Sequence, residues 1–193
     1  MRRILSFVVA LVFALPLAAQ DFKIDPVHSS ANFAVKHMLV STVRGRFAGA
    51  VNGAIHYDPA DIGKSSVTAV IAAASIDTDN QMRDNDLRSA HFFDVEKYPE
   101  LKFQSTKVEK RGDGYVAIGN LTIKDVTKQI ELPFTLTEAD VKGRKKLGVE
   151  AGITINRLDY HVNYDPTGAA VGKDVKIELD LEANQVDAAA PGK

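Results

Sequence analysis

Histidines, arginines and carboxylates are the side chains of this 193-residue chain that could do chemistry, and five histidines are spread along it. His37 follows the alternating stretch "SANFAVKHM", whose parity places it on the same side as Phe33 and Val35. It could donate a hydrogen bond to a carbonyl or phosphate group of a ligand, with the charge of Lys36 beside it, or be satisfied by backbone inside a core. The sequence leaves both interpretations open.

A charged segment, "MRDNDLRSAHFF", places Arg83 and Arg88 around two aspartates and ahead of Phe92 and Phe93. In one interpretation an arginine meets the polar head of a ligand while the phenylalanines plug the interior of the fold. In the other, Arg83 and the neighbouring aspartate hold the segment in place through charge-assisted hydrogen bonds. The same two interpretations apply to "NRLDY" at residues 156–160, where a bracing role is favoured.

No residue pattern marks a catalytic or metal centre. The absence of cysteine excludes thiol chemistry and cysteine-ligated metals, and no Gly-x-Ser-x-Gly motif offers a serine nucleophile. Asp84 with Asp86, or His37 with Asp25, could be drawn as general acid and base, but no nucleophile accompanies them. No two histidines lie three to five positions apart, as in common zinc motifs. We therefore expect no catalytic residue, no metal, no cofactor and no enzyme activity.

Residues 1–19 have the features of a secretory signal peptide. Two arginines precede an unbroken apolar run over residues 7–15, and Ala18 and Ala19 supply a small-residue cleavage site. A membrane-spanning helix needs about 20 apolar residues, so this run is too short for an anchor. We expect export to the periplasm, or secretion, and one mature domain over residues 20–193.

The charge of the mature chain argues against nucleic acid as a partner. The full chain carries a net charge of −1 and the signal segment holds two arginines, so about −3 remains after its removal. About 170 residues are enough to form a single domain with its own core. Because there is no cysteine, burial and backbone hydrogen bonds alone must hold this domain together.

The elements that must position these side chains are amphipathic strands. In "VGKDVKIELDLEA", residues 171–183, Val175, Ile177 and Leu179 share one side and charged residues share the other, as the two-residue repeat of a strand requires. Comparable alternation, separated by turn signals, predicts about eight or nine mostly antiparallel strands. The predicted strands lie at residues 31–37, 43–57, 66–76, 101–108, 115–123, 129–137, 147–155 and 175–183, with a short helix at 83–89 and a loose tail at 184–193.

Strands at this spacing are typical of a sandwich or a closed barrel. Long amphipathic strands and interior glycines, with no central tryptophan or disulfide, favour an antiparallel β-barrel of about eight strands. Gly45, Gly49 and Gly53 alternate with Phe47 and Val51 on one face, which predicts bends at a barrel corner or room left for something else. An eight-stranded barrel is either just filled by side chains or able to hold one slender ligand.

Six motifs follow one another in order along residues 21–183. They are "IDPVHSSANFAVKHM", "RGRFAGAVNGAIHYDP", "DTDNQMRDNDLRSAHFFDVEKYPELKFQST", "GNLTIKDVTKQIELPF", "GITINRLDYHV" and "VGKDVKIELDLEA". In this order they resemble the motifs of the YceI-like family of bacterial periplasmic proteins. The resemblance implies an all-β, lipocalin-like barrel with a short helix, whose interior holds a long isoprenoid chain, and it implies no established catalytic activity.

The resulting hypothesis is a periplasmic carrier that sequesters an isoprenoid lipid, of the polyprenyl phosphate or quinone type, from water. A secreted, stress-related interaction protein with a packed, ligand-free barrel is the alternative. A transient membrane contact and a homodimer both remain open. The predicted ligand-binding residues are Phe33, Val35, His37, Phe47, Gly49, Val51, Ile55, Arg83, Arg88, Phe92, Phe93, Leu121, Ile153, Ile155, Ile177 and Leu179.

Overall fold

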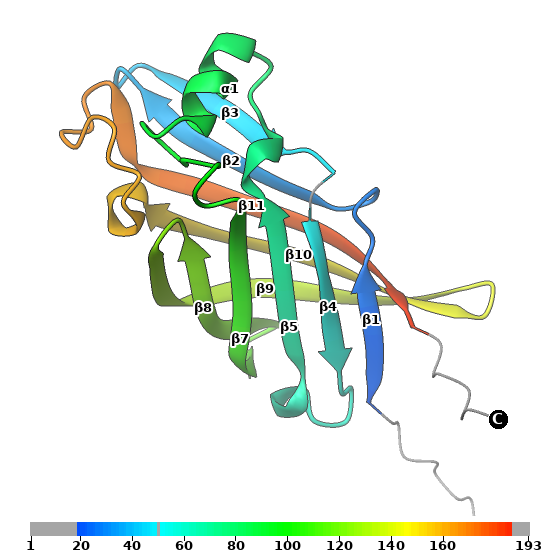
Figure 1. Ribbon diagram of the computed structural model, residues 1–193. Coiled ribbons are helices and arrows are strands. Elements are labelled where there is room, and N and C mark those ends of the chain that lie inside the picture. The colour runs from blue at the N-terminus through cyan, green and yellow to red at the C-terminus, as the bar shows by residue number, and fades with distance from the viewer. Residues whose placement is uncertain (1–18, 50, 187–193) are drawn as a thin grey trace, which may run out of the picture.

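The computed structural model describes residues 19–49 and 51–186, which form a strongly twisted β-structure with one α-helix (Figure 1). The predicted signal peptide therefore lies outside the described residues, except for its last position. The strands are β1 Gln20–Ile24, β2 Ser30–His37, β3 Ser41–Phe47, β4 Val51–Tyr57, β5 Ser66–Ala72, β6 Ile76–Asp77, β7 Glu100–Arg111, β8 Gly114–Ile123, β9 Val126–Val141, β10 Arg144–Asn156 and β11 Val171–Gln185. The helices are α1 Gln81–Arg88 and the 3₁₀ turns η1 Ile62–Lys64, η2 Ala73–Ser75 and η3 Arg157–Tyr160.

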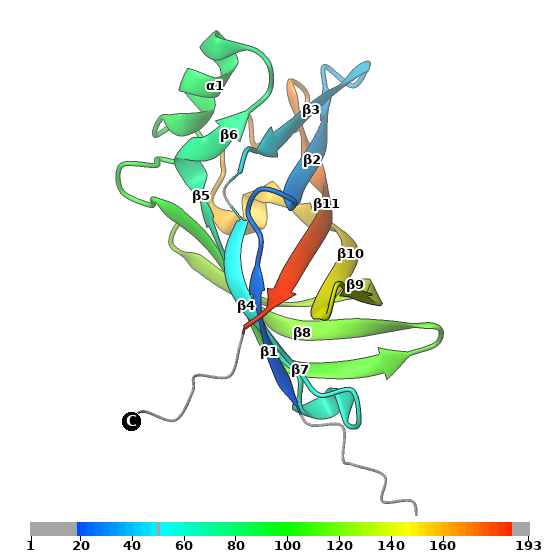
Figure 2. The same cartoon turned by 90° about the vertical axis from the view of Figure 1, so that its right-hand side faces the viewer.

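Eight strands close into an antiparallel barrel in the order β1-β4-β5-β7-β8-β9-β10-β11, which confirms the predicted fold. The pairing of Phe22 with Gln185 and of Ile24 with Ala183 joins β11 back to β1. The first half of β11 pairs instead with β2, and β3 and β6 extend the sheet from there. Figure 2 shows these added strands and α1 at one end of the barrel, away from the start of β1 and the end of β11.

Several predicted boundaries differ from those of the structure. The alternation over residues 43–57 belongs to two strands, β3 and β4, which do not pair with each other, and Gly49 lies in the break between them at φ +59°. Period-two alternation continues across this break, so parity alone could not reveal it. The tail is also shorter than predicted, because β11 runs to Gln185, and Asn184 and Gln185 pair with β1 to close the barrel.

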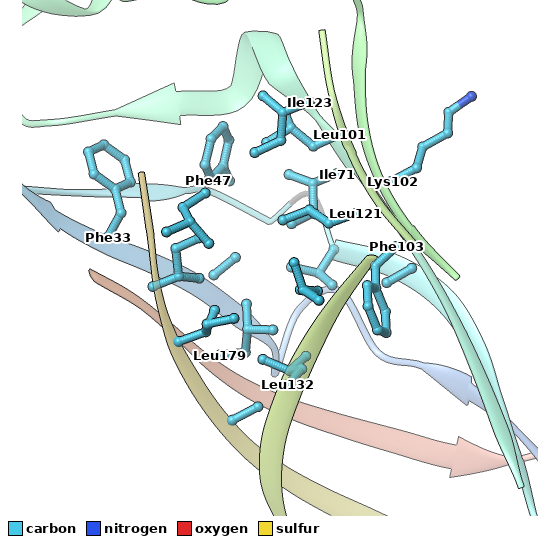
Figure 3. A pocket seen from close by; sticks show the side chains of 18 of the residues that line it. Phe33, Phe47, Ile71, Leu101, Lys102, Phe103, Leu121, Ile123, Leu132 and Leu179 are labelled. Carbon is cyan, nitrogen blue, oxygen red and sulfur yellow. The ribbon is translucent and has the colours of Figure 1, made fainter. Parts of the chain in front are cut away.

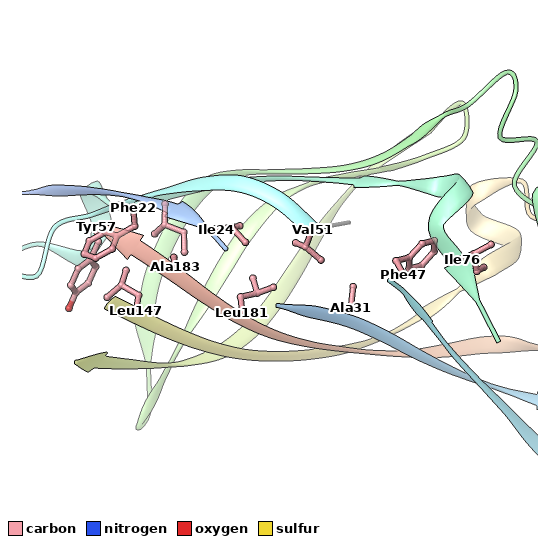
Figure 4. Close-up of a cluster of buried hydrophobic side chains, with 11 residues drawn as sticks. Phe22, Ile24, Ala31, Phe47, Val51, Tyr57, Ile76, Leu147, Leu181 and Ala183 are labelled. Carbon is pink, nitrogen blue, oxygen red and sulfur yellow. The ribbon is translucent and has the colours of Figure 1, made fainter. Parts of the chain in front are cut away.

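One end of the interior is solidly packed. Phe22, Ile24, Leu147 and Ala183 are almost completely buried there, and Figure 4 shows them gathered beside Tyr57. Phe22 and Tyr57 meet edge to face, with ring centroids 6.5 Å apart. The Tyr57 hydroxyl donates a 2.6 Å hydrogen bond to Glu138, and burial raises the pKa of this phenol above its ordinary value. This apolar plug seals the barrel where β1, β4 and β11 meet.

Helix α1 begins two residues before the predicted start because Asn80 caps it. The Asn80 side-chain oxygen accepts a hydrogen bond from the Arg83 backbone N–H. The buried carboxylate of Asp84 accepts hydrogen bonds from both the N–H and the hydroxyl of Thr78. Helix α1 has eight residues, and no helix in the described residues has the length and apolar character needed to cross a membrane.

Candidate binding cavity

The barrel interior beyond the packed end is hollow. Its cavity measures about 240 Å³, counted as the space open to the centre of a water molecule. By that measure about 10–15 Å³ suffices for a single water, so this space is far larger than a packing defect. In Figure 3 side chains such as Phe33, Leu121 and Leu179 point from different strands toward a common space, whereas Lys102 points away from it.

The burial pattern along β11 shows where packing stops. Leu181 and Ala183, at the sealed end, are buried, yet Ile177 and Leu179 on the same inward face are only partly buried. The intervening residues, such as Glu178, are exposed on the outer face. Because the inward side chains face the lumen, the area that they leave uncovered faces the cavity. One strand therefore runs from a solid core into an open, apolar space.

Most of the sequence-predicted apolar residues line this cavity. They come from β2, β3, β4, β8, β10, β11 and the segment after α1. These lining residues are Phe33, Val35, Phe47, Val51, Ile55, Phe92, Phe93, Leu121, Ile153, Ile155, Ile177 and Leu179.

The sequence reasoning missed the lining contributed by β5, β7 and β9. Each of these strands has an alternating apolar face, so the same parity argument could have found them. The additional apolar lining residues on these strands are Val67, Ala69, Ile71, Leu101, Phe103, Val108, Ile130, Leu132, Phe134 and Leu136.

Aromatic side chains gather where β2, β3 and the segment after α1 meet. Phe47 lies between Phe33 and Phe93, with centroid distances of 5.9 and 6.0 Å. Phe92 packs against Tyr164 at 4.9 Å. This arrangement agrees with the predicted placement of Phe92 and Phe93 against the interior of the fold.

Gly45 shows what room an interior glycine leaves. A Cβ at Gly45 would lie 2.4 Å from the tip of the Phe33 ring, closer than any real contact. Gly119 accommodates Phe103 in the same way, at 2.7 Å.

We expect Gly45→Ala to force the Phe33 ring from its place and to lower the free energy of unfolding by about 1–3 kcal/mol, measured by urea unfolding. An unchanged unfolding midpoint would contradict this packing role.

Gly49 and His37 do not line the cavity. A Cβ on Gly49 would meet no described atom within 4 Å, because the residue sits in an open turn. His37 is exposed at the last position of β2, where the strand leaves the barrel for the turn to Ser41. Although its position in the alternation is an inward one, the strand has already left the barrel at His37. The prediction that this side chain lies beside the lumen is therefore wrong.

Arg83 and Arg88 also lie outside the lining and brace the helix. Arg83 donates from Nε to the Thr78 hydroxyl at 2.7 Å and from Nη2 to the Thr78 carbonyl at 2.8 Å. Arg88 donates to the carbonyls of Ala74 and Ile76 at 2.8 and 2.6 Å. Of the two interpretations of this segment, the geometry favours the bracing one.

Arg157 is a buried charged residue at the cavity wall, with only 4% of the residue exposed. Burial lowers its pKa from the ordinary value. The guanidinium donates five hydrogen bonds of 2.5–2.9 Å to backbone carbonyls of the loop before β11 and of the first two residues of β11. The acceptors are the carbonyls of Val162, Tyr164, Asp165, Val171 and Gly172. With every N–H direction committed to backbone, Arg157 shapes the wall rather than presenting a charge to the lumen.

A cluster that the sequence did not reveal joins Asp25, His28 and Glu182, whose ligand atoms lie within 4.8 Å of one another. The His28 ring nitrogen lies 3.0 Å from the Asp25 carboxylate, and Asn184 donates to the same oxygen. Glu182 is paired with Lys146. Because each carboxylate already has a cationic or N–H partner, the cluster acts as an ion-pair network that ties the connection between β1 and β2 to β11.

This network predicts a pH dependence. The hydrogen bond from His28, together with that from the Val27 N–H, lowers the pKa of Asp25 to about 2, and Asp25 raises the pKa of His28 above 6.5. The stabilisation of the fold by ionised Asp25 is present above pH 3.8 and is lost as the pH falls toward 2. The stabilisation by protonated His28 is present below pH 6.5 and is lost as the pH rises through the pKa of His28 in the folded protein. In Asp25→Asn the pKa of His28, followed by NMR, should fall toward its ordinary value. A His28 pKa that does not move would contradict the pairing.

Comparisons with known proteins agree with this geometry. The family model of the YceI-like domain matches residues 22–183. A UPF0312 protein of Yersinia pestis (strain Pestoides F) is 36% identical over 182 residues, covering 92% of this chain and 93% of the relative. The crystal structure of the Campylobacter jejuni YCEI protein superposes with a TM-score of 0.72 at 32% identity, covering 79% of this chain and 90% of the other.

A third comparison concerns the fold alone. A polyisoprenoid binding domain from Saccharophagus degradans, implicated in plant cell wall breakdown, superposes with a TM-score of 0.65 at 13% identity, covering 86% of this chain and 98% of that domain. The family match spans the barrel from β1 to β11, including the strands that line the cavity. The chain therefore belongs to the YceI-like family.

Proposed function

We propose that the protein binds the hydrocarbon chain of an isoprenoid lipid inside its barrel and carries it through the periplasm. The observation that carries the proposal is the hollow apolar lumen. Ile177 and Leu179 point into the barrel but are only partly buried, because the space in front of them is empty. A fold neighbour described as a polyisoprenoid binding domain supports the idea that this barrel can hold such a chain. The predicted signal peptide supports the periplasmic location.

The affinity of an apolar tunnel for a hydrocarbon chain increases with the length of chain that it buries. Each buried methylene contributes ~0.8 kcal/mol, so one five-carbon isoprene unit gives roughly 3–4 kcal/mol. Association costs ~4–15 kcal/mol, so at the lower end of that cost four buried units leave the ~8 kcal/mol that corresponds to micromolar affinity. The polar head, whether a quinone or a phosphate, would then remain near an opening of the barrel rather than among the aliphatic walls, because burying it unpaired is costly.

The geometry favours this carrier over a ligand-free interaction protein. A scaffold needs a filled centre, and the sealed end around Phe22 and Leu147 shows that this chain can fill one. The same strands leave the rest of the interior open. Cavities lined by apolar groups cost stability, so an unfilled lumen of this size is accounted for by a ligand rather than by packing.

The proposal is tested with a neutral, slender fluorescent probe. After delipidation, the mature protein should take up N-phenyl-1-naphthylamine with a rise in fluorescence, and geranylgeraniol should displace it at micromolar concentration. Hexanol at the same concentration serves as a control for non-specific competition, because it buries too few methylenes to bind. No probe uptake by folded, delipidated protein would contradict a binding lumen.

A further inference from the structure

The tip of the β2–β3 hairpin, Met38–Val40, presents three consecutive apolar side chains to solvent. Met38 is 58% exposed, Leu39 74% and Val40 86%. Scattered single apolar residues are common on protein surfaces, but a continuous exposed run at a projecting tip calls for a partner.

The backbone conformation of this tip is one that disfavours large apolar residues. Met38 and Leu39 have φ angles of 51° and 60°, and the Val40 N–H bonds back to the His37 carbonyl at 3.1 Å. The loop between the paired residues His37 and Ser41 therefore places two consecutive residues at positive φ, where Gly and Asn are favoured. Large apolar side chains are strained there, and strain at exposed positions often accompanies function.

The hairpin itself carries charges of one sign. No acidic residue occurs between Asp25 and Asp58, a stretch that contains both hairpin strands. Lys36 and Arg44 lie on the exposed outer face of the hairpin, and neither forms an ion pair with another described residue. An apolar tip flanked by unpaired cations matches a membrane interface rich in anionic lipid.

The tip also adjoins the cavity. The Met38 N–H donates to the Ala170 carbonyl, and His37 pairs with Val171, which lines the lumen together with Val35. Figures 1 and 2 place the hairpin tip at the same end of the barrel as α1, which carries the exposed Met82. A surface touching this end would therefore lie close to the lining of the lumen.

We propose that the Met38–Val40 tip inserts into the interface of an anionic lipid bilayer, with Lys36 and Arg44 against its headgroups. This docking deepens the proposed function, since it would bring the lumen to the membrane that holds the lipid cargo. The docking itself does not require that cargo.

The test compares flotation of the mature protein with vesicles of phosphatidylethanolamine and phosphatidylglycerol (3:1) and with phosphatidylcholine vesicles. The double variant Met38→Asn with Leu39→Gly places residues that tolerate positive φ at both positions, so it should fold at least as well as the parent. We expect its partitioning onto the anionic vesicles to fall about tenfold or more, because two large apolar side chains are removed. The parent should bind phosphatidylcholine weakly, and high salt should reduce its binding to anionic vesicles.

Val141→Thr is the matched control, because Val141 is also exposed, at 46%, beside the hairpin turn between β9 and β10 at the other end of the barrel. This control should bind anionic vesicles like the parent. Equal vesicle binding by the double variant and the parent would overturn the proposal. It would also be overturned if the parent ignores vesicles but forms a dimer that the double variant loses, since the tip would then cover a second copy. Probe uptake without vesicles should be unchanged in the double variant, so failure of docking and failure of lipid binding are distinguished.

Discussion

Ala151→Phe should abolish lipid retention and leave the barrel folded. Ala151 lies on β10, paired with Leu179 and Phe134, and its methyl group lines the open part of the lumen. A phenyl ring at this position can occupy space that is empty in the parent, and it would interrupt the path of a hydrocarbon chain. Loss of even one buried isoprene unit removes roughly 3–4 kcal/mol, so the affinity should fall more than about a hundredfold.

Thr154→Phe is the matched control for this variant. Thr154 is three residues further along β10 and exposed on the outer face, so the same ring added there leaves the lumen untouched. Lipid extraction followed by mass spectrometry, with circular dichroism to verify the fold, would compare the two variants. If Ala151→Phe is folded and retains as much lipid as Thr154→Phe, the chain does not run past Ala151.

Arg157→Met should cause the largest loss of stability among single substitutions at the cavity wall. It removes the donor of five hydrogen bonds and leaves buried carbonyls such as those of Val162 and Val171 without partners. Removing one side of a buried, charge-assisted network costs ~3–5 kcal/mol. For a domain of this size that corresponds to a fall in Tm of roughly 10 °C.

Arg111→Met is the control for the loss of an arginine. Arg111 is exposed and pairs with Glu109 and Glu131, and exposed ion pairs contribute only ~0–1 kcal/mol. Thermal unfolding by calorimetry should therefore separate the two variants clearly. An Arg157→Met protein that unfolds at the temperature of Arg111→Met would contradict the bracing role of the buried guanidinium.

The sequence was most informative where strand periodicity alone decides the geometry. Inward parity correctly placed Ile153, Ile155, Ile177 and Leu179 on the cavity wall. It was wrong for Gly49, because the alternation continues across the break between β3 and β4 in which Gly49 lies. Parity has meaning only while a residue remains inside the barrel.

His37 and the chain end illustrate the other limit of sequence reasoning. His37 occupies an inward position in the alternation but lies at the end of β2, and it is exposed. Its exposure depends on how far β2 extends beyond the barrel. The sequence of β2 alone does not reveal that length. Asn184 and Gln185 look like part of a polar tail, yet pairing with β1 holds them in the sheet. Contacts between residues about 160 positions apart, such as Asn184 with Asp25, have no local signature.

The volume of the lumen could likewise not be predicted from the pattern of residue types. Alternation predicts an apolar inner face for a packed barrel and for a hollow one alike. The difference arises from how large side chains meet across the interior, as Phe22 and Leu147 do at the sealed end, while Ile177 and Leu179 face open space. Only the three-dimensional arrangement separates these cases.

Native mass spectrometry of the mature protein purified from its own host tests the central claim most directly. Binding of an isoprenoid chain in the hollow interior predicts an added mass that organic solvent removes and that fragmentation identifies by its repeating five-carbon losses. Protein delipidated and reloaded with geranylgeraniol shows that the instrument preserves such a complex. If the reloaded protein keeps its ligand while the protein from the host carries no apolar molecule, the carrier function is contradicted.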